Sequence, residues 1–118
     1  MRQPTIYHNP RCSKSRATLE WLVARGFAPR IVHYLETPPS PAELERLLTL
    51  LGLEPRDVLR KEEHEYSDLG LADSKLTRRA LIAAIAAHPR LLQRPIVVVD
   101  GKAAIGRPPE AVLAILPE

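Results

Sequence analysis

The sequence predicts an α/β fold on one four-stranded mixed sheet, in the order β-α-β, helical insert, β-β-α. Three features predict it. Residues 5–35 alternate strand, helix and strand signals, residues 40–92 hold helical and turn signals, and residues 96–105 hold two strand-like runs around a tight turn. Parallel strands need a long crossover, whereas antiparallel strands need only a hairpin. We therefore expect the first strand pair to be parallel and the last pair to be antiparallel.

The first three elements lie in residues 5–35. Residues 5–8 predict a short strand, and Asn9-Pro10 predicts a turn. Apolar residues recur at helical spacing between Ser13 and Arg25, and Gly26 suits the end of that helix because glycine readily adopts the left-handed conformation. The β-branched residues within 30–35 predict the second strand.

The helical insert, about residues 40–92, is marked by capping residues. Ser40 is a predicted N-cap, with Pro41 at the first helical position and Glu43 three residues after the cap. Gly52 is expected to end this helix. Thr77 caps a further predicted helix that ends near residue 87, and short helices and turns are expected between 54 and 76.

The C-terminal part returns to strand signals. Residues 96–99 are the most strand-like run, Asp100-Gly101 is a strong hairpin signal, and residues 102–105 form the predicted partner strand. A last helix is predicted over 110–115. The sequence contains no repeat and no interdomain linker, so we expect a single domain over residues 1–118.

Composition narrows the class of protein. The 118 residues have a formal net charge of +3, which is too small an excess to indicate nucleic acid and equally fits a small anionic substrate. One cysteine excludes an internal disulfide. No stretch approaches the ~18 apolar residues of a membrane span, and no apolar leader opens the sequence. We expect a cytoplasmic protein that binds neither membrane nor nucleic acid. The sequence has no zinc-ligand spacing and no nucleotide-binding glycine pattern, so we expect no bound metal or cofactor.

The loop between the first strand and first helix contains the cysteine. A thiol at a helix N-terminus faces backbone N–H groups and the positive end of the helix dipole, which lower its pKa. Arg11, Lys14 and Arg16 add positive charge within one turn of Cys12, and His8 precedes it by four residues. These neighbours favour a reactive Cys12 over the alternative, a small buried cysteine that only packs.

Residues 8–16, HNPRCSKSR, resemble the active-site loop of the glutaredoxin-coupled arsenate reductase family, whose pattern is H-N-P-x-C-x-x-S-R. From the Ser13-Lys14 pair and the end at Glu118, we expect the chain to resemble a shorter subgroup of that family most. Further ordered matches span nearly the whole chain: Tyr34-Leu35-Glu36-Thr37-Pro38, Leu59-Arg60-Lys61, Leu69-Gly70-Leu71-Ala72, His88-Pro89, Arg94-Pro95-Ile96-Val97 and Gly106-Arg107-Pro108.

This resemblance implies a thioredoxin-like fold with a helical insert, and it implies roles for individual residues. Cys12 is the expected nucleophile, with His8 as a second catalytic residue. The oxyanion is expected to be bound by arginines, whose planar fork suits tetrahedral anions, together with a serine of the loop. These substrate-binding residues are Arg60, Arg94, Arg107, Arg16 and Ser15. Pro95 matches the cis-proline that faces the active site in this fold.

The residue count limits the mechanism. A two-electron reduction by thiols needs two sulfur atoms, and this chain has one. The resemblance implies that Cys12 forms a covalent adduct with arsenate or a related oxyanion, that glutathione is the co-substrate, and that glutaredoxin resolves the mixed disulfide.

Two other functions fit parts of the sequence. Redox-sensing regulators of this fold bind RNA polymerase and typically use a C-x-x-C switch, but Ser15 stands at the second cysteine position. A general monothiol reductase of glutathione mixed disulfides would need Cys12 but not the three distant arginines. The acidic run Glu62, Glu63, His64, Glu65 could suggest a metal site, but consecutive residues converge poorly on one ion, so we expect a solvated face.

Overall fold

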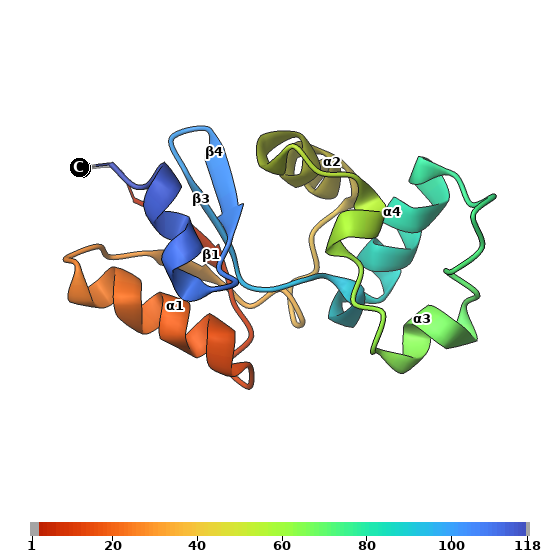
Figure 1. Ribbon diagram of the computed structural model, residues 1–118, viewed down its shortest axis with the longest axis horizontal. Coiled ribbons are helices and arrows are strands. Elements are labelled where there is room, and N and C mark those ends of the chain that lie inside the picture. The colour runs from red at the N-terminus through yellow and green to blue at the C-terminus, as the bar shows by residue number, and fades with distance from the viewer. Residues whose placement is uncertain (1–2, 118) are drawn as a thin grey trace. The chain divides into compact units, whose positions relative to one another are not determined.

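The computed structural model describes residues 3–117. They form two compact units, one made of residues up to Thr37 together with those from Arg94 onward, and the other of Pro38–Gln93. Figure 1 shows the elements of each unit. The first unit contains the sheet and the cysteine, and the second contains the predicted helical insert.

The sheet of the first unit has four strands in the order β2-β1-β3-β4. Strand β1 (Thr5–Tyr7) pairs in parallel with β2 (Arg30–Val32) and antiparallel with β3 (Ile96–Val99), which in turn pairs antiparallel with β4 (Lys102–Ile105). The predicted four-stranded mixed sheet is confirmed. Asp100 and Gly101 form the β3–β4 turn with φ of 56° and 71°, the left-handed geometry that a two-residue hairpin requires.

Helix α1 (Ser13–Ala24) and the 3₁₀ helix η3 (Pro109–Ile115) pack together beside this sheet (Figure 1). Ile6 of β1 and Val97 of β3 are register partners, so their side chains lie on the same face. Together with Leu22 of α1 and Val112 of η3 they form a fully buried cluster. This cluster packs the C-terminal half of α1 against the sheet, so the loop that contains Cys12 joins a strand and a helix that are packed together.

Three predicted elements of this unit differ in detail. The first strand was expected over 5–8 but ends at Tyr7. The second strand was expected over 30–35 but ends at Val32, because the backbone N–H groups of Glu36 and Thr37 both donate to the carbonyl of His33 and close a turn there. The last helix forms where it was expected but as a 3₁₀ helix, beginning one residue earlier at Pro109. Its β-branched and proline residues are poor helix formers, which suits the shorter, tighter form.

The second unit consists of α2 (Pro41–Leu51), η1 (Pro55–Val58), α3 (His64–Asp68), α4 (Arg78–Ala87) and η2 (Pro89–Leu91). The predicted caps are confirmed: the Ser40 hydroxyl accepts from the N–H of Glu43, the Thr77 hydroxyl accepts from the N–H of Ala80, and Gly52 ends α2 in the left-handed conformation. Leucine and isoleucine side chains of α2 and α4 form the buried interior. No helix among residues 3–117 is long and apolar enough to cross a bilayer.

Gly106, directly after β4, lies close to the side chains of Thr18 and Pro95. A Cβ atom built there would lie 2.5 Å from Thr18 Oγ1 and 2.8 Å from Pro95 Cγ. We expect Gly106→Ala to lower the free energy of unfolding by about 1–3 kcal/mol, because both neighbours are buried and must shift. Urea denaturation measures this loss. Combining it with Thr18→Ala, which removes the nearer atom, should cost less than the sum of the two single changes, and strict additivity would contradict this account.

Candidate functional site

Cys12 is the N-cap residue of α1. Its backbone is extended, its carbonyl accepts from the N–H of Arg16 at 2.9 Å, and its own N–H donates to the carbonyl of Asn9 at 3.0 Å. The predicted turn at Asn9-Pro10 therefore places Cys12 at the start of the helix. The residue is 7% exposed, so its sulfur is sheltered while facing the free N–H groups of the first helical turn.

Two arginines from distant parts of the chain converge on this sulfur. The Arg94 guanidinium hydrogen-bonds to Cys12, and Arg107 Nη2 lies 3.6 Å from Cys12 Sγ. Arg107 Nε also donates to the main-chain carbonyl of Arg94 at 2.7 Å, which ties the two arginines together. The Arg94-Pro95 peptide bond is cis, as predicted. The result is a sulfur surrounded by one helix N-terminus and two permanent cations.

These surroundings act on the pKa of the Cys12 thiol in opposite directions. Burial raises it, since a charged sulfur loses water. The N–H of Ser15, the hydrogen bond and charge of Arg94, and the N–H of Lys14 lower it, and their combined effect prevails. The pKa of Cys12 is therefore below its ordinary value, and the thiolate is the favoured nucleophilic form near neutral pH.

This shift predicts how alkylation of Cys12 depends on pH. The rate with iodoacetamide should reach half its plateau below pH about 8.5, the ordinary value for a cysteine thiol, because only the thiolate reacts. Arg94→Ala should move the midpoint to higher pH, since it removes a cation that stabilises the thiolate. A midpoint that is the same in both proteins would show that Arg94 does not act on the sulfur.

His8 hydrogen-bonds to Ser15. His8 Nδ1 lies 2.6 Å from Ser15 Oγ, and the same oxygen accepts from the N–H of Asn9 at 3.0 Å. Burial, then the charges of His33 and Arg16, lower the pKa of His8. In the neutral tautomer protonated at Nε2, Nδ1 accepts a hydrogen bond from the Ser15 hydroxyl. Ser15 thus joins the strand end to the first turn of α1, and its own N–H stabilises the thiolate.

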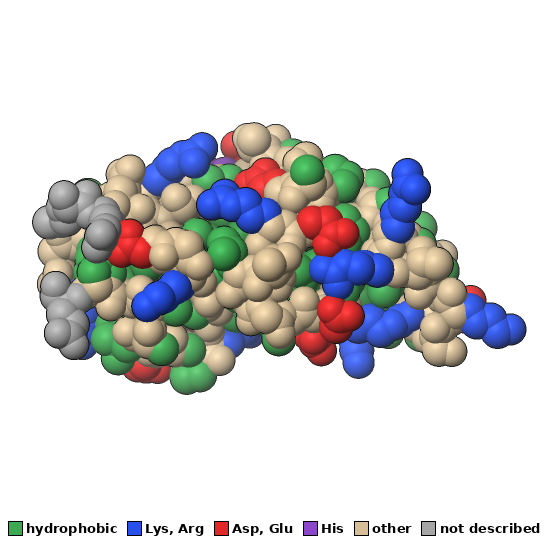
Figure 2. Space-filling view, turned by 90° about the horizontal axis from the view of Figure 1, so that it is seen from above, with side chains coloured by type: hydrophobic (Ala, Val, Ile, Leu, Met, Phe, Trp, Pro, Cys, Tyr) green, Lys and Arg blue, Asp and Glu red, His purple; other side chains and the backbone are tan. Residues whose placement is uncertain are grey.

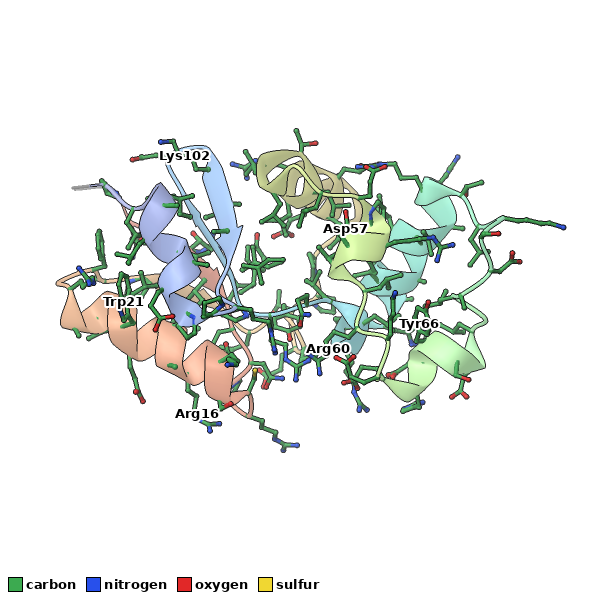
Figure 3. The ribbon with its side chains drawn as sticks, viewed as in Figure 1. Arg16, Trp21, Asp57, Arg60, Tyr66 and Lys102 are labelled. Atoms are coloured by element: carbon green, nitrogen blue, oxygen red, sulfur yellow. The ribbon has the colours of Figure 1, made fainter. Side chains whose placement is uncertain are left out.

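Arg16 is exposed on the first turn of α1 (Figure 3), and its Nη1 donates to the carbonyl of Pro10 at 2.9 Å. This contact links the first turn of α1 to the Asn9-Pro10 turn, and it was not predicted from the sequence. Arg11 and Lys14 are also exposed. The loop therefore presents three cations to solvent near a sheltered sulfur.

Arg60 belongs to the second unit, whereas Cys12, His8, Ser15, Arg16, Arg94 and Arg107 all belong to the first. It lies between η1 and α3 (Figure 3) and is 8% exposed. Its N–H donates to the carbonyl of Leu91 at 2.7 Å, within a short bridge between Leu59 and Leu92. Its guanidinium contacts Glu62, Glu63 and Gln93, and none of these three contacts was predicted from the sequence.

The acidic run 62–65 is only partly the solvated face that the sequence predicted. Glu62 and His64 are well exposed, with side chains 62% and 64% accessible, but Glu63 and Glu65 keep only 15% and 12%. Glu63 forms ion pairs with both Arg60 and Arg90, and Glu65 lies 3.9 Å from Arg90. No group of metal-binding side chains forms within the described range 3–117. On the face drawn in Figure 2, basic and acidic side chains are interspersed.

The chain is similar to known proteins over nearly its whole length. A model of the ArsC family matches residues 7–115. The uncharacterized protein YfgD of Escherichia coli K12 is 53% identical over 98% of both chains. An arsenate reductase of Neisseria meningitidis is 51% identical over 94% of this chain and 96% of its own. The solved structure of an arsenate reductase from Vibrio cholerae has a TM-score of 0.95 and 54% identity, covering 98% of each chain.

Proposed function

Since the chain belongs to the ArsC family, we propose that it is an arsenate reductase whose nucleophile is Cys12 and whose electron donors are glutathione and glutaredoxin. The observation that most supports this is the convergence of Arg94 and Arg107 on the Cys12 sulfur at the N-terminus of α1. A buried thiolate held between cations is suited to attack an anion that would otherwise repel it.

In the first step, the Cys12 thiolate forms a sulfur–arsenic bond with arsenate. One arsenate oxygen takes up protons and leaves as water, so arsenic stays pentavalent in the adduct. Arg94 and Arg107 neutralise the oxyanion beside the sulfur, and Arg60 is the third proposed arginine ligand. His8, Ser15 and Arg16 keep the loop in the reactive geometry through the contacts from His8 to Ser15 and from Arg16 to the Pro10 carbonyl.

In the second step, the thiol of glutathione attacks the Cys12 sulfur. A disulfide forms between the two sulfurs, the sulfur–arsenic bond breaks, and its electron pair reduces arsenic to arsenite, which leaves. Glutaredoxin then exchanges with the mixed disulfide and restores the Cys12 thiolate. The second sulfur must come from outside because the chain has one cysteine. A pool of reduced glutathione is found in the cytoplasm, which is the proposed location of the protein.

The test is a coupled assay in which glutathione reductase reports oxidised glutathione as consumption of NADPH. With arsenate, glutathione and glutaredoxin present, we expect NADPH loss matched one to one by arsenite. Leaving out glutaredoxin should slow the reaction strongly. NADPH consumption that does not depend on arsenate would overturn the proposal in favour of a general glutathione-linked thiol reductase.

A further inference from the structure

Arg60 has a guanidinium whose three nitrogen atoms all face partners of its own unit. Nε donates to Glu63 Oε2 at 3.3 Å, Nη1 donates to Gln93 Oε1 at 3.0 Å, and Nη2 lies 3.1 Å from Glu62 Oε1. A guanidinium binds an oxyanion through one of two edges, Nε with Nη2 or Nη1 with Nη2. Because Nη2 belongs to both edges, the Glu62 carboxylate stands beside either edge that an oxyanion would use.

The two carboxylates differ in how firmly they are held. Glu63 is 15% exposed and also accepts from Arg90 Nη2 at 2.9 Å, so it links two arginines in a sheltered place. Arg90 and Arg60 lower its pKa against the raising effect of burial. Glu62 is 62% exposed, and its ion pair in this structure is with Arg60. Glu63 therefore orients Arg60, whereas Glu62 can turn away into water at little cost.

We propose that Glu62 is a built-in competitor for the oxyanion site: its carboxylate occupies Nη2 of Arg60 and is displaced when the oxyanion binds. This inference rests on the proposed function, in which Arg60 is one of the oxyanion ligands. The carboxylate stands in for the anionic substrate, and its negative charge opposes the positive field of Arg60. Glu62 thereby sets how much oxyanion is needed to occupy Arg60.

The expected effect follows from the exposure of Glu62, whose side chain is 62% accessible while that of Arg60 is sheltered. Exposed ion pairs are worth about 0.2–1 kcal/mol, so removing the competing charge should strengthen oxyanion binding by roughly up to fivefold. Glu62→Gln removes the charge and keeps the shape of the side chain. Glu45→Gln is a matched control in the same unit, because Glu45 is an exposed carboxylate that pairs with Arg78 at 2.7 Å instead.

The first measurement is the NMR signal of the Arg60 Nε–H group, assigned by its loss in Arg60→Lys. Arsenate is titrated into the wild-type protein, Glu62→Gln and Glu45→Gln without glutathione, so that no turnover occurs. We expect half-saturation at roughly 1.4- to fivefold lower arsenate in Glu62→Gln, with Glu45→Gln unchanged. Equal half-saturation in all three proteins, or an Arg60 signal that does not respond to arsenate, would overturn the inference.

The second measurement separates this inference from the proposed function. In the coupled assay, Glu62→Gln should lower KM for arsenate by the same factor as in the titration, with the gain in KM rather than in kcat. A raised KM would identify Glu62 as a structural partner of Arg60 and overturn the inference. Absence of arsenate turnover in the wild-type protein would overturn the proposed function, while the titration would still decide whether Glu62 competes at Arg60.

Discussion

Cys12→Ser is expected to lower arsenate-dependent turnover by at least about 10³-fold, which is the scale of losing a nucleophile. A serine hydroxyl is not ionised near neutral pH, and its oxygen cannot form the disulfide on which the second step depends. The change is nearly isosteric, and the N-cap position favours serine, so α1 should form as before. The coupled NADPH assay measures the loss.

Two controls make this result specific. The circular dichroism spectrum and unfolding midpoint of Cys12→Ser should match or exceed those of the wild-type protein, because serine is a better helix cap than cysteine. Ser13→Ala changes an exposed hydroxyl one residue away and should keep most of the activity. Turnover by Cys12→Ser above about a tenth of the wild-type rate would show that the sulfur is not the nucleophile.

The properties of Cys12 that depend on residues close to it in the sequence can be predicted from the sequence. The turn at Asn9-Pro10, the helix that begins at Ser13 and the nearby cations lie within nine residues, and together they predict a helix N-terminus with a lowered thiol pKa. The predicted resemblance to the ArsC family is confirmed by the match over residues 7–115. The elements that position the loop also follow from local signals, such as the Asp100-Gly101 hairpin.

Contacts across long stretches of sequence cannot be predicted in this way. The resemblance selects Arg107 but does not show that its Nε holds the carbonyl of Arg94, because that contact depends on the β3–β4 hairpin returning beside the loop. Similarly, nothing in the run Glu62-Glu63 indicates that one carboxylate is sheltered and the other exposed. That difference arises from Arg90, which lies 27 residues further along the chain.

Arg107→Ala is expected to lower kcat/KM for arsenate by about 10²-fold, the typical effect of losing one donor to developing negative charge. The substitution removes two contacts. Arg107 Nη2 lies 3.6 Å from Cys12 Sγ, and Arg107 Nε donates to the Arg94 carbonyl. Arg25→Ala is the matched control: it removes the same charge from the same unit, where Arg25 stacks on Trp21 at 4.0 Å. Its kcat/KM should change by less than about twofold.

Arg107→Lys decides which property of the arginine matters. Lysine keeps the charge but has one nitrogen in place of a planar fork, so it cannot place separate nitrogens at the sulfur and at the Arg94 carbonyl as Arg107 does. If the fork orients Arg94, kcat/KM for arsenate in Arg107→Lys should remain within about tenfold of that in Arg107→Ala. The pH midpoint of Cys12 alkylation should rise in both variants. Full activity of Arg107→Lys would mean that charge alone suffices, and the contact to the Arg94 carbonyl would then contribute nothing to the reaction.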